Sequence, residues 1–145
     1  MSKPLVPFET TLLVRDTCLC LHVQRAARAL ARRFDEALRP VGLTNGQFSL
    51  MMSLNRPKAP SIGSVASLLA MDRTTLTAAL KPVERRGLVT VTPDPDDRRS
   101  RLLTLTDAGR ELLANAVPIW QRMHAAIETD LGDANGLRAS LMALS

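Results

Sequence analysis

The sequence predicts a mainly α-helical protein that carries a small β-hairpin. Two short helical segments, each preceded by a capping residue, follow one another over residues 61–86, and a charged turn between two short apolar runs comes directly after them. Long stretches on both sides repeat apolar residues at steps of three and four, the spacing of one helical stripe. We therefore expect one domain, 1–145, with a winged helix-turn-helix over 44–106 and long helical regions over 12–39 and 107–145.

The chain is basic, with a net charge of +5 and an isoelectric point near 10.2. Of its 19 Lys and Arg residues, 16 lie within residues 1–101. A basic balance of this kind favours an anionic partner, and nucleic acid is the usual one.

Nothing in the sequence points to export or to a membrane. Residues 1–10 lack the apolar region of a secretory signal, and no apolar run approaches the length of a bilayer span. Two cysteines without an export signal fit a reducing compartment. We expect a cytoplasmic protein.

The first long helix is predicted over 12–39, where Pro40 and Gly42 would end it. Its apolar stripe is Leu12, Leu19, Cys20, Val23, Ala27, Leu30, Phe34 and Leu38. Thr44 and Gln47 then form a capping box, in which the side chain of each residue accepts the backbone N–H of the other. This box predicts a second helix over Phe48–Leu54, followed by a loop over 56–60.

Two short helical units come next, with Ser61 as the cap of the first and Asp72 as the cap of the second. Gly87 is the predicted C-terminal stop of the second unit. Its buried stripe would be Leu76, Leu80 and Val83, and its opposite face Thr74, Thr77, Lys81 and Arg85. Pro82 cannot donate to the carbonyl of Ala78, so we expect a kink or a local loosening there.

The β-branched run 88–92 and the run 101–106 are predicted to pair as an antiparallel hairpin. The turn between them collects Asp94, Asp96, Asp97, Arg98, Arg99 and Arg101. Thr106 would cap a long helix through roughly Asp130, and Gly132 would separate it from a final helix.

Such a helix pair and hairpin suit duplex DNA. The second helix offers hydroxyls and a cation to base edges in the major groove, and arginines at the hairpin tip suit a narrow minor groove. For Asp97 we expect the role of holding the Arg99 guanidinium in a fixed geometry. The alternatives are a solvated hairpin tip and an ordinary amphipathic surface helix.

Two segments, "LLAMDRTTLTAALKPVERRGLV" (68–89) and "DPDDRRSRLLTLTDAGREL" (94–112), resemble the MarR family of bacterial transcriptional regulators. The second segment resembles the wing signature of that family, with an Asp-x-Arg pair at Asp97 and Arg99. Leu105, Thr106 and Gly109 complete the signature.

The resemblance implies a homodimer held by the first and last helices, with one winged lobe on each half of a pseudo-palindromic operator. It also implies a repressor that releases DNA when a small molecule or an oxidant acts near the junction of the dimer and winged lobes. Arg99 would enter the minor groove. The candidate DNA-binding residues are Arg73, Thr74, Thr75, Thr77, Lys81, Asp97, Arg98, Arg99 and Arg101.

The two cysteines raise an alternative, a thiol-based oxidant sensor. In one helix Cys18 and Cys20 would lie about 200° apart and could not bond to each other. The organic-hydroperoxide repressors, a subgroup of the family, sense oxidants with a cysteine in the first helix, and Cys20 falls at that place. Those repressors surround the thiol with tyrosines, whereas this chain has none and holds Gln24, Phe34 and Asn45 at the matching places.

Other chemistry has less support in the sequence. Cys18 and His22 share a helical spacing, but a zinc site needs three or four ligands and the chain has only one other histidine, His124, so we expect no metal or other cofactor. No phosphate loop or nucleophile motif indicates an enzyme. Met51 and Met52 are candidates for lining a cavity for a small apolar or phenolic effector. A winged helix that binds a protein instead of DNA is the remaining alternative.

Overall fold

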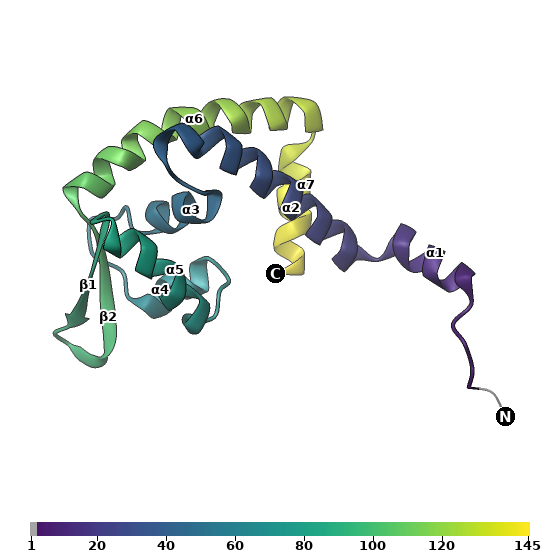
Figure 1. Ribbon diagram of the computed structural model, residues 1–145, viewed down its shortest axis with the longest axis horizontal. Helices are drawn as coiled ribbons and strands as arrows, with labels where there is room; N and C mark the ends of the chain where they lie inside the picture. Colours follow the sequence, from purple (N-terminus) through teal and green to yellow (C-terminus); the bar gives the residue numbers. More distant parts are fainter. Residues whose placement is uncertain (1–2) are drawn as a thin grey trace. The chain divides into compact units, whose positions relative to one another are not determined.

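The computed structural model describes residues 3–145, which form two compact units: one extends through Arg33 and the other spans Phe34–Ser145. Each unit is described by itself. In chain order the elements are α1 (Phe8–Thr17), α2 (Leu19–Leu38), the 3₁₀ helix η1 (Arg39–Val41), α3 (Asn45–Ser53), α4 (Ile62–Leu68), α5 (Arg73–Arg85), β1 (Val89–Asp94), β2 (Asp97–Leu105), α6 (Asp107–Leu131) and α7 (Ala134–Leu144) (Figure 1). Within residues 3–145, no helix has both the length and the apolar character needed to cross a membrane.

The prediction of one continuous helix over 12–39 is wrong, because α1 ends at Thr17 and α2 begins at Leu19. Between them, Cys18 adopts an extended backbone with ψ of 112°. Asp16, Thr17 and Cys18 are three consecutive weak helix formers. The Thr17 hydroxyl also donates to the Leu13 carbonyl at 2.6 Å, a bond that often bends a helix.

The break at Cys18 changes the geometry of the cysteine pair. The Cys18 sulfur accepts the N–H of Leu21 at 3.5 Å, so Cys18 acts as the cap of α2 instead of a residue within a helix. The separation of about 200° around one helix therefore does not describe Cys18 and Cys20. The same correction applies to the helical spacing of Cys18 and His22, although the His22 N–H still donates to the Cys18 carbonyl at 3.1 Å.

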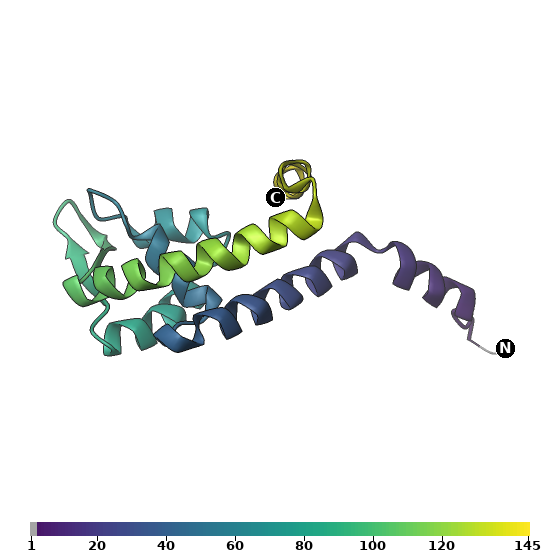
Figure 2. The ribbon, with the colours of Figure 1, turned by 90° about the horizontal axis from the view of Figure 1, so that it is seen from above.

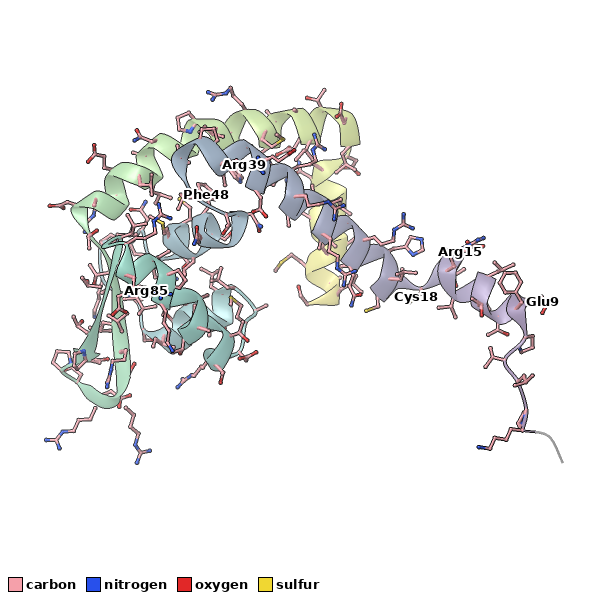
Figure 3. All side chains as sticks on the ribbon, in the orientation of Figure 1. Glu9, Arg15, Cys18, Arg39, Phe48 and Arg85 are labelled. Atoms are coloured by element: carbon pink, nitrogen blue, oxygen red, sulfur yellow. The ribbon has the colours of Figure 1, made fainter. Side chains whose placement is uncertain are left out.

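The second unit has one hydrophobic core, to which every element from the end of α2 to α6 contributes. The predicted capping box is confirmed: the Thr44 hydroxyl accepts the N–H of Gln47, and the Gln47 side chain accepts the N–H of Thr44. The helix that follows, α3, packs against α6. Its residue Phe48, labelled in Figure 3, is buried in the core and lines the cavity described below.

The helix-turn-helix consists of α4 and α5. Ser61 caps α4 through the N–H of Ser64, and Asp72 caps α5 through the N–H of Thr75, as predicted. Gly87 follows α5 with φ of +73°, a left-handed conformation that glycine adopts without strain. The helix continues through Pro82 to Arg85, so the expected kink stays a prediction.

The wing is longer than the sequence predicted. β1 and β2 pair in an antiparallel register from Val89↔Leu105 to Pro93↔Arg101, and the register shifts after Pro93. The predicted turn residues Asp94, Asp97 and Arg99 therefore lie in the strands themselves. A third segment, which sequence reasoning missed, borders β2: the Leu103 N–H donates to the Pro60 carbonyl at 3.0 Å, and Ser61 forms a bridge with Leu102.

The last two helices follow the prediction closely. The Thr106 hydroxyl caps α6 by accepting the N–H of Gly109, and α6 runs to Leu131, past Pro118 in its interior. Gly132, with φ of +86°, then separates it from α7. Figure 2 shows the hairpin at the N-terminal end of α6 and α7 at its C-terminal end.

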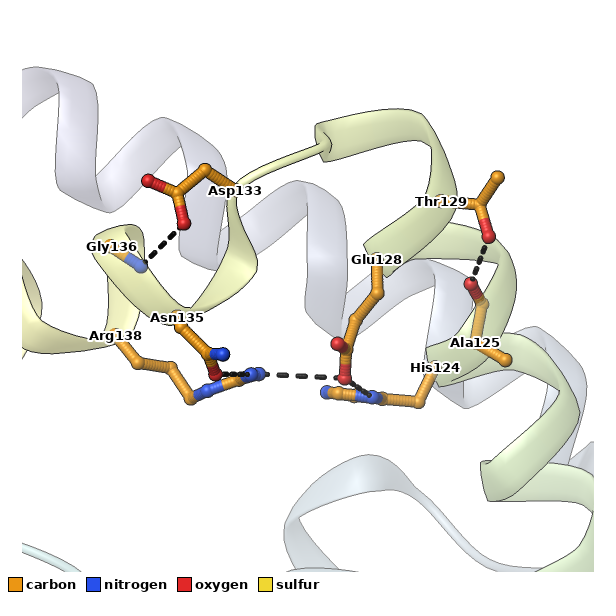
Figure 4. A network of polar contacts seen from close by, with 8 residues as sticks. All are labelled: His124, Ala125, Glu128, Thr129, Asp133, Asn135, Gly136 and Arg138. Atoms are coloured by element: carbon orange, nitrogen blue, oxygen red, sulfur yellow. Dashed lines mark hydrogen bonds and ion pairs between the residues drawn. The ribbon is translucent and has the colours of Figure 1, made fainter.

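A polar network joins α6 to α7 (Figure 4). His124 Nδ1 and Glu128 Oε1 lie 2.8 Å apart, and the same Glu128 oxygen accepts from Arg138 Nη1 at 3.5 Å. Arg138 Nη2 donates to the Asn135 side chain at 2.7 Å. Side chains from both helices thus hold the turn between them.

Candidate nucleic-acid interface

The polar face of α5 is open to solvent. Leu76, Leu80 and Val83 are buried in the core, as predicted. Because this stripe anchors one side of the helix, its other side points outward. The exposed residues of α5 include Arg73, Thr74, Thr75, Thr77, Lys81 and Arg85.

Asp72 organises the first turn of α5. One carboxylate oxygen accepts the Thr75 N–H at 2.7 Å, and the other accepts the Thr75 hydroxyl at 2.8 Å. These bonds, the backbone one first, lower the pKa of Asp72 below its usual value. The hydroxyl proton of Thr75 is therefore committed to Asp72, which distinguishes Thr75 from Thr74 and Thr77.

At the tip of the wing, backbone N–H groups donate hydrogen bonds to aspartate carboxylates and fix the local backbone. Asp94 accepts the N–H of Asp96 at 2.9 Å, and Asp97 accepts the N–H of Arg99 at 3.0 Å. The expected pairing of Asp97 with the Arg99 guanidinium is therefore replaced by a bond to the Arg99 backbone. Asp97 lies only two residues from Arg99, so its short side chain closes this local turn, as aspartates commonly do.

The arginines of the tip extend into solvent. Arg98, Arg99 and Arg101 are exposed, and within residues 3–145 none of them takes part in an ion pair. Figure 3 shows nitrogen-tipped side chains that extend from the end of the hairpin. The basic charge of the wing is thus available to an external anion.

A hydrogen bond ties the end of α5 to the segment after α2. Arg86 Nη1 donates to the Gly42 carbonyl at 2.7 Å, and Gly42 has φ of +70°. Sequence reasoning did not find this contact, because the two residues are 44 positions apart and no local pattern connects them.

A cavity of about 560 Å³ opens between α3, α4 and α6. Both Met51 and Met52 were predicted to line a cavity. Met52 lines this one and is 40% exposed, whereas Met51 is fully buried in the core and does not line it. The two are adjacent on a helix, so their side chains point about 100° apart. The lining residues are Phe48, Ser49, Met52, Ser53, Leu68, Leu69, Val117, Trp120 and Gln121.

Aromatic rings form one wall of this cavity. Trp120 stacks on Phe48 with ring centroids 6.2 Å apart and on His124 at 4.5 Å. Phe34 lies against His124, and the side chain of Asn45 donates to Asp35. Trp120 is partly buried against the core and lines the cavity. Sequence reasoning did not find this wall, because residues from several helices form it and no single helix carries its pattern.

In the first unit, Cys20 is exposed and Gln24 Nε2 donates to its sulfur at 3.3 Å. Gln24 therefore supplies a hydrogen bond to the thiol. Within residues 3–145, no group of three or more His, Cys, Asp and Glu side chains is arranged to hold a metal ion.

Known proteins share this arrangement. The model of the MarR family matches residues 43–100, which include the helix-turn-helix and most of the wing. The transcriptional activatory protein BadR of Rhodopseudomonas palustris is 36% identical over 97 residues, which cover 65% of this chain and 55% of BadR. The chain thus spans about half the length of that curated relative.

Two solved structures are similar over most of their length. The transcriptional regulator MosR of Mycobacterium tuberculosis, in complex with DNA, is 37% identical with a TM-score of 0.82, over 88% of this chain and 93% of MosR. The transcriptional repressor CouR, bound to a 23-mer DNA duplex, is 31% identical with a TM-score of 0.73, over 90% of this chain and 92% of CouR.

Proposed function

The chain belongs to the MarR family, and from that premise we propose that it is a sequence-specific DNA-binding transcriptional regulator of the cytoplasm. It acts as a homodimer on a pseudo-palindromic operator and represses transcription until a small effector binds. It is a binding protein and not an enzyme. MosR and CouR support the proposal, since their structures hold DNA.

One observation carries this proposal: the same compact unit exposes both the polar face of α5 and the arginines of the wing. A buried stripe anchors α5, and backbone pairing anchors β1 and β2, so neither surface needs to form on binding. Preformed surfaces lose less entropy when they associate with a partner.

The exposed side chains divide into two roles. Thr74 and Thr77, with Lys81, face the major groove and contact base edges. Arg99 enters the minor groove, where a guanidinium is attracted by the negative potential between the phosphates. Arg98 and Arg101 contact phosphates and make the affinity depend on salt.

The cavity beside α3 and α4 receives the effector. Its wall is mainly apolar and aromatic, with Ser49, Ser53 and Gln121 as polar exceptions, which fits a small apolar or phenolic molecule. An effector bound there would contact both α4 and α6. Release follows if it favours an arrangement of the dimer whose recognition helices no longer match successive major grooves.

A fluorescence-anisotropy titration tests the function. The labelled probe is the DNA immediately upstream of the protein's own gene, and random DNA is the competitor at fixed salt. We expect tight binding that random DNA fails to displace. Equal displacement by random and specific DNA at every candidate operator would contradict the proposal and favour a protein partner for the wing.

The exposure of Cys20 and its bond from Gln24 favour a second candidate, an oxidant-sensing repressor. Oxidation of the thiol to a sulfenic acid would add an oxygen at this position and change the bond to Gln24. Peroxide treatment should then release the protein from DNA, and Cys20→Ser should abolish that response. A wild-type protein that keeps its DNA affinity after treatment would exclude this candidate.

A further inference from the structure

Gly63 and Arg73 lie against each other across the helix-turn-helix. A Cβ atom placed on Gly63 would come within 2.8 Å of Arg73 Nη2 and 3.6 Å of Arg73 Cζ. Gly63 occupies the first turn of α4, and Arg73 is the first residue of α5. The Arg73 side chain therefore folds back over α4 and occupies the space that a larger residue at position 63 would fill.

The guanidinium of Arg73 has no ionic partner among the residues that the structure describes. Within residues 3–145, Arg73 takes part in none of the ion pairs, and its residue is exposed. An arginine presents its N–H donors in a planar fork that suits phosphate oxygens. Its position on α4 thus leaves it available to an anion outside the protein.

From this packing we propose that Gly63 is a positioning residue. Because it has no side chain, the Arg73 guanidinium can lie against α4, where it contacts a DNA phosphate. The proposal rests on the proposed DNA-binding function and deepens it. In a helix-turn-helix the first helix crosses the DNA backbone, whereas the second enters the major groove. A guanidinium held on α4 therefore lies beside the DNA backbone. Thr74 and Thr77, farther along the exposed face of α5, contact the base edges.

Substitution of Gly63 by alanine separates positioning from folding. The atom that the new methyl group would meet is the far end of a flexible side chain, so Arg73 can swing away at little cost. Alanine also favours a helix more than glycine does. We expect Gly63→Ala to fold with unchanged or slightly higher stability, but its Arg73 side chain should no longer lie against α4.

Gly46 provides a matched control. It is the second residue of α3, just as Gly63 is the second residue of α4, and both helices carry a hydroxyl cap. A Cβ on Gly46 would meet only the Thr44 hydroxyl at 4.0 Å, which is ordinary contact. Gly46→Ala therefore makes the same chemical change without displacing an arginine.

The experiment measures the affinity of the full-length chain for its operator and for random DNA over a range of salt concentrations. We expect Gly63→Ala and Arg73→Ala to weaken both affinities severalfold and by the same factor, and to reduce the salt slope by about one. Gly46→Ala should bind like the wild type. In the Arg73→Ala background, Gly63→Ala should have no further effect, because the side chain that it displaces is absent.

Three results would overturn the proposal while leaving the DNA-binding function intact. These are wild-type binding by Gly63→Ala, additive losses in the double variant, and a loss confined to the operator, which would make Arg73 a base contact. If the wild-type protein itself shows no preference for its operator, the proposed function fails first, so the two failures are distinguishable.

Discussion

Gly109 illustrates how much one residue can decide. It lies in the first turn of α6, where a Cβ atom would fall on the backbone carbonyl of Leu88. The same carbonyl accepts the N–H of Thr106, and the Thr106 hydroxyl donates to the Gly87 carbonyl at 2.6 Å. Glycine at this position allows α6 to start directly on the base of the wing, which explains a glycine in the wing signature.

We expect Gly109→Ala to lower the free energy of unfolding by about 1–3 kcal/mol, because the methyl group meets backbone that cannot move aside as a side chain does. Urea unfolding measures this change. Asn115→Ala, at an exposed position of the same helix, should change stability by less than about 0.5 kcal/mol. Equal stabilities of the two variants would show that α6 can shift to accommodate the methyl group.

Asp35 is a second residue whose environment has a measurable consequence. Its carboxylate accepts the backbone N–H of Asn45 at 2.7 Å and the Asn45 side-chain amide at 2.8 Å. These bonds, the backbone one first, hold the pKa of Asp35 below its usual 3.8. The end of α2 is thereby fastened to the first turn of α3.

This lowered pKa predicts a pH dependence of stability. Since the folded-state pKa lies below the unfolded-state value, the bonds contribute fully above the unfolded value and are lost as the pH falls through the folded value. We expect Asp35→Asn to melt at a lower temperature at neutral pH and to lose less stability than the wild type on acidification below about pH 5. Melting curves over that range measure both effects.

Asp130→Asn is the control for this series. Asp130 is exposed near the end of α6, so its variant should follow the wild-type pH profile. If Asp35→Asn also follows that profile, Asp35 does not contribute to the acid sensitivity of the fold.

At the scale of elements, the wing combines a rigid frame with free charge. Asp97 bonds to the backbone of Arg99, while the Arg99 guanidinium forms no ion pair within residues 3–145. Asp94 and Asp97 therefore shape the backbone of the tip, and within residues 3–145 neither forms an ion pair with an arginine. The arginines remain available to DNA.

We expect Arg99→Ala to weaken operator binding by about 1–3 kcal/mol and to flatten its dependence on salt, because the proposed complex would lose a cation from the minor groove. Anisotropy titrations at several salt concentrations measure both quantities. Arg122→Ala, which removes an exposed arginine from α6, is the matched control and should bind like the wild type. Wild-type affinity of Arg99→Ala would remove the wing from the mechanism.

At the scale of the whole molecule, α7 exposes apolar surface that a single chain leaves uncovered. Leu137, Leu141 and Met142 are 43%, 40% and 74% exposed, respectively. Leu137 and Leu141 are four residues apart and share one face of the helix. Such a face fits the proposed role of the last helix in a homodimer.

We expect the double variant Leu137→Glu/Leu141→Glu to be a monomer, because two carboxylates would have to lose their hydration inside the interface. Light scattering measures the mass, and circular dichroism checks that the helices persist. Ala139→Glu adds the same charge at an exposed position of α7 about 200° around the helix from Leu137, and this variant should remain a dimer. A dimeric double variant would place the interface elsewhere.

The sequence by itself determined the features that depend on local chemistry. Thr44, Ser61, Asp72 and Thr106 were recognisable as caps because a capping side chain bonds to backbone within three residues of itself. The stripe of Leu76, Leu80 and Val83 was equally readable from its period. The fold class and the family followed from these local signals and from the wing signature.

The tertiary structure decided the features in which distant residues meet. Three contacts join residues between 10 and 44 positions apart: Arg73 against Gly63, Arg86 with Gly42, and Pro60 with Leu103 of β2. The cavity beside Trp120 is likewise lined by residues of three helices. The break at Cys18 escaped prediction for a related reason. Periodicity detects an apolar stripe, but whether that stripe is buried, and so holds the helix together, depends on its partners, and no residue of α1 is buried.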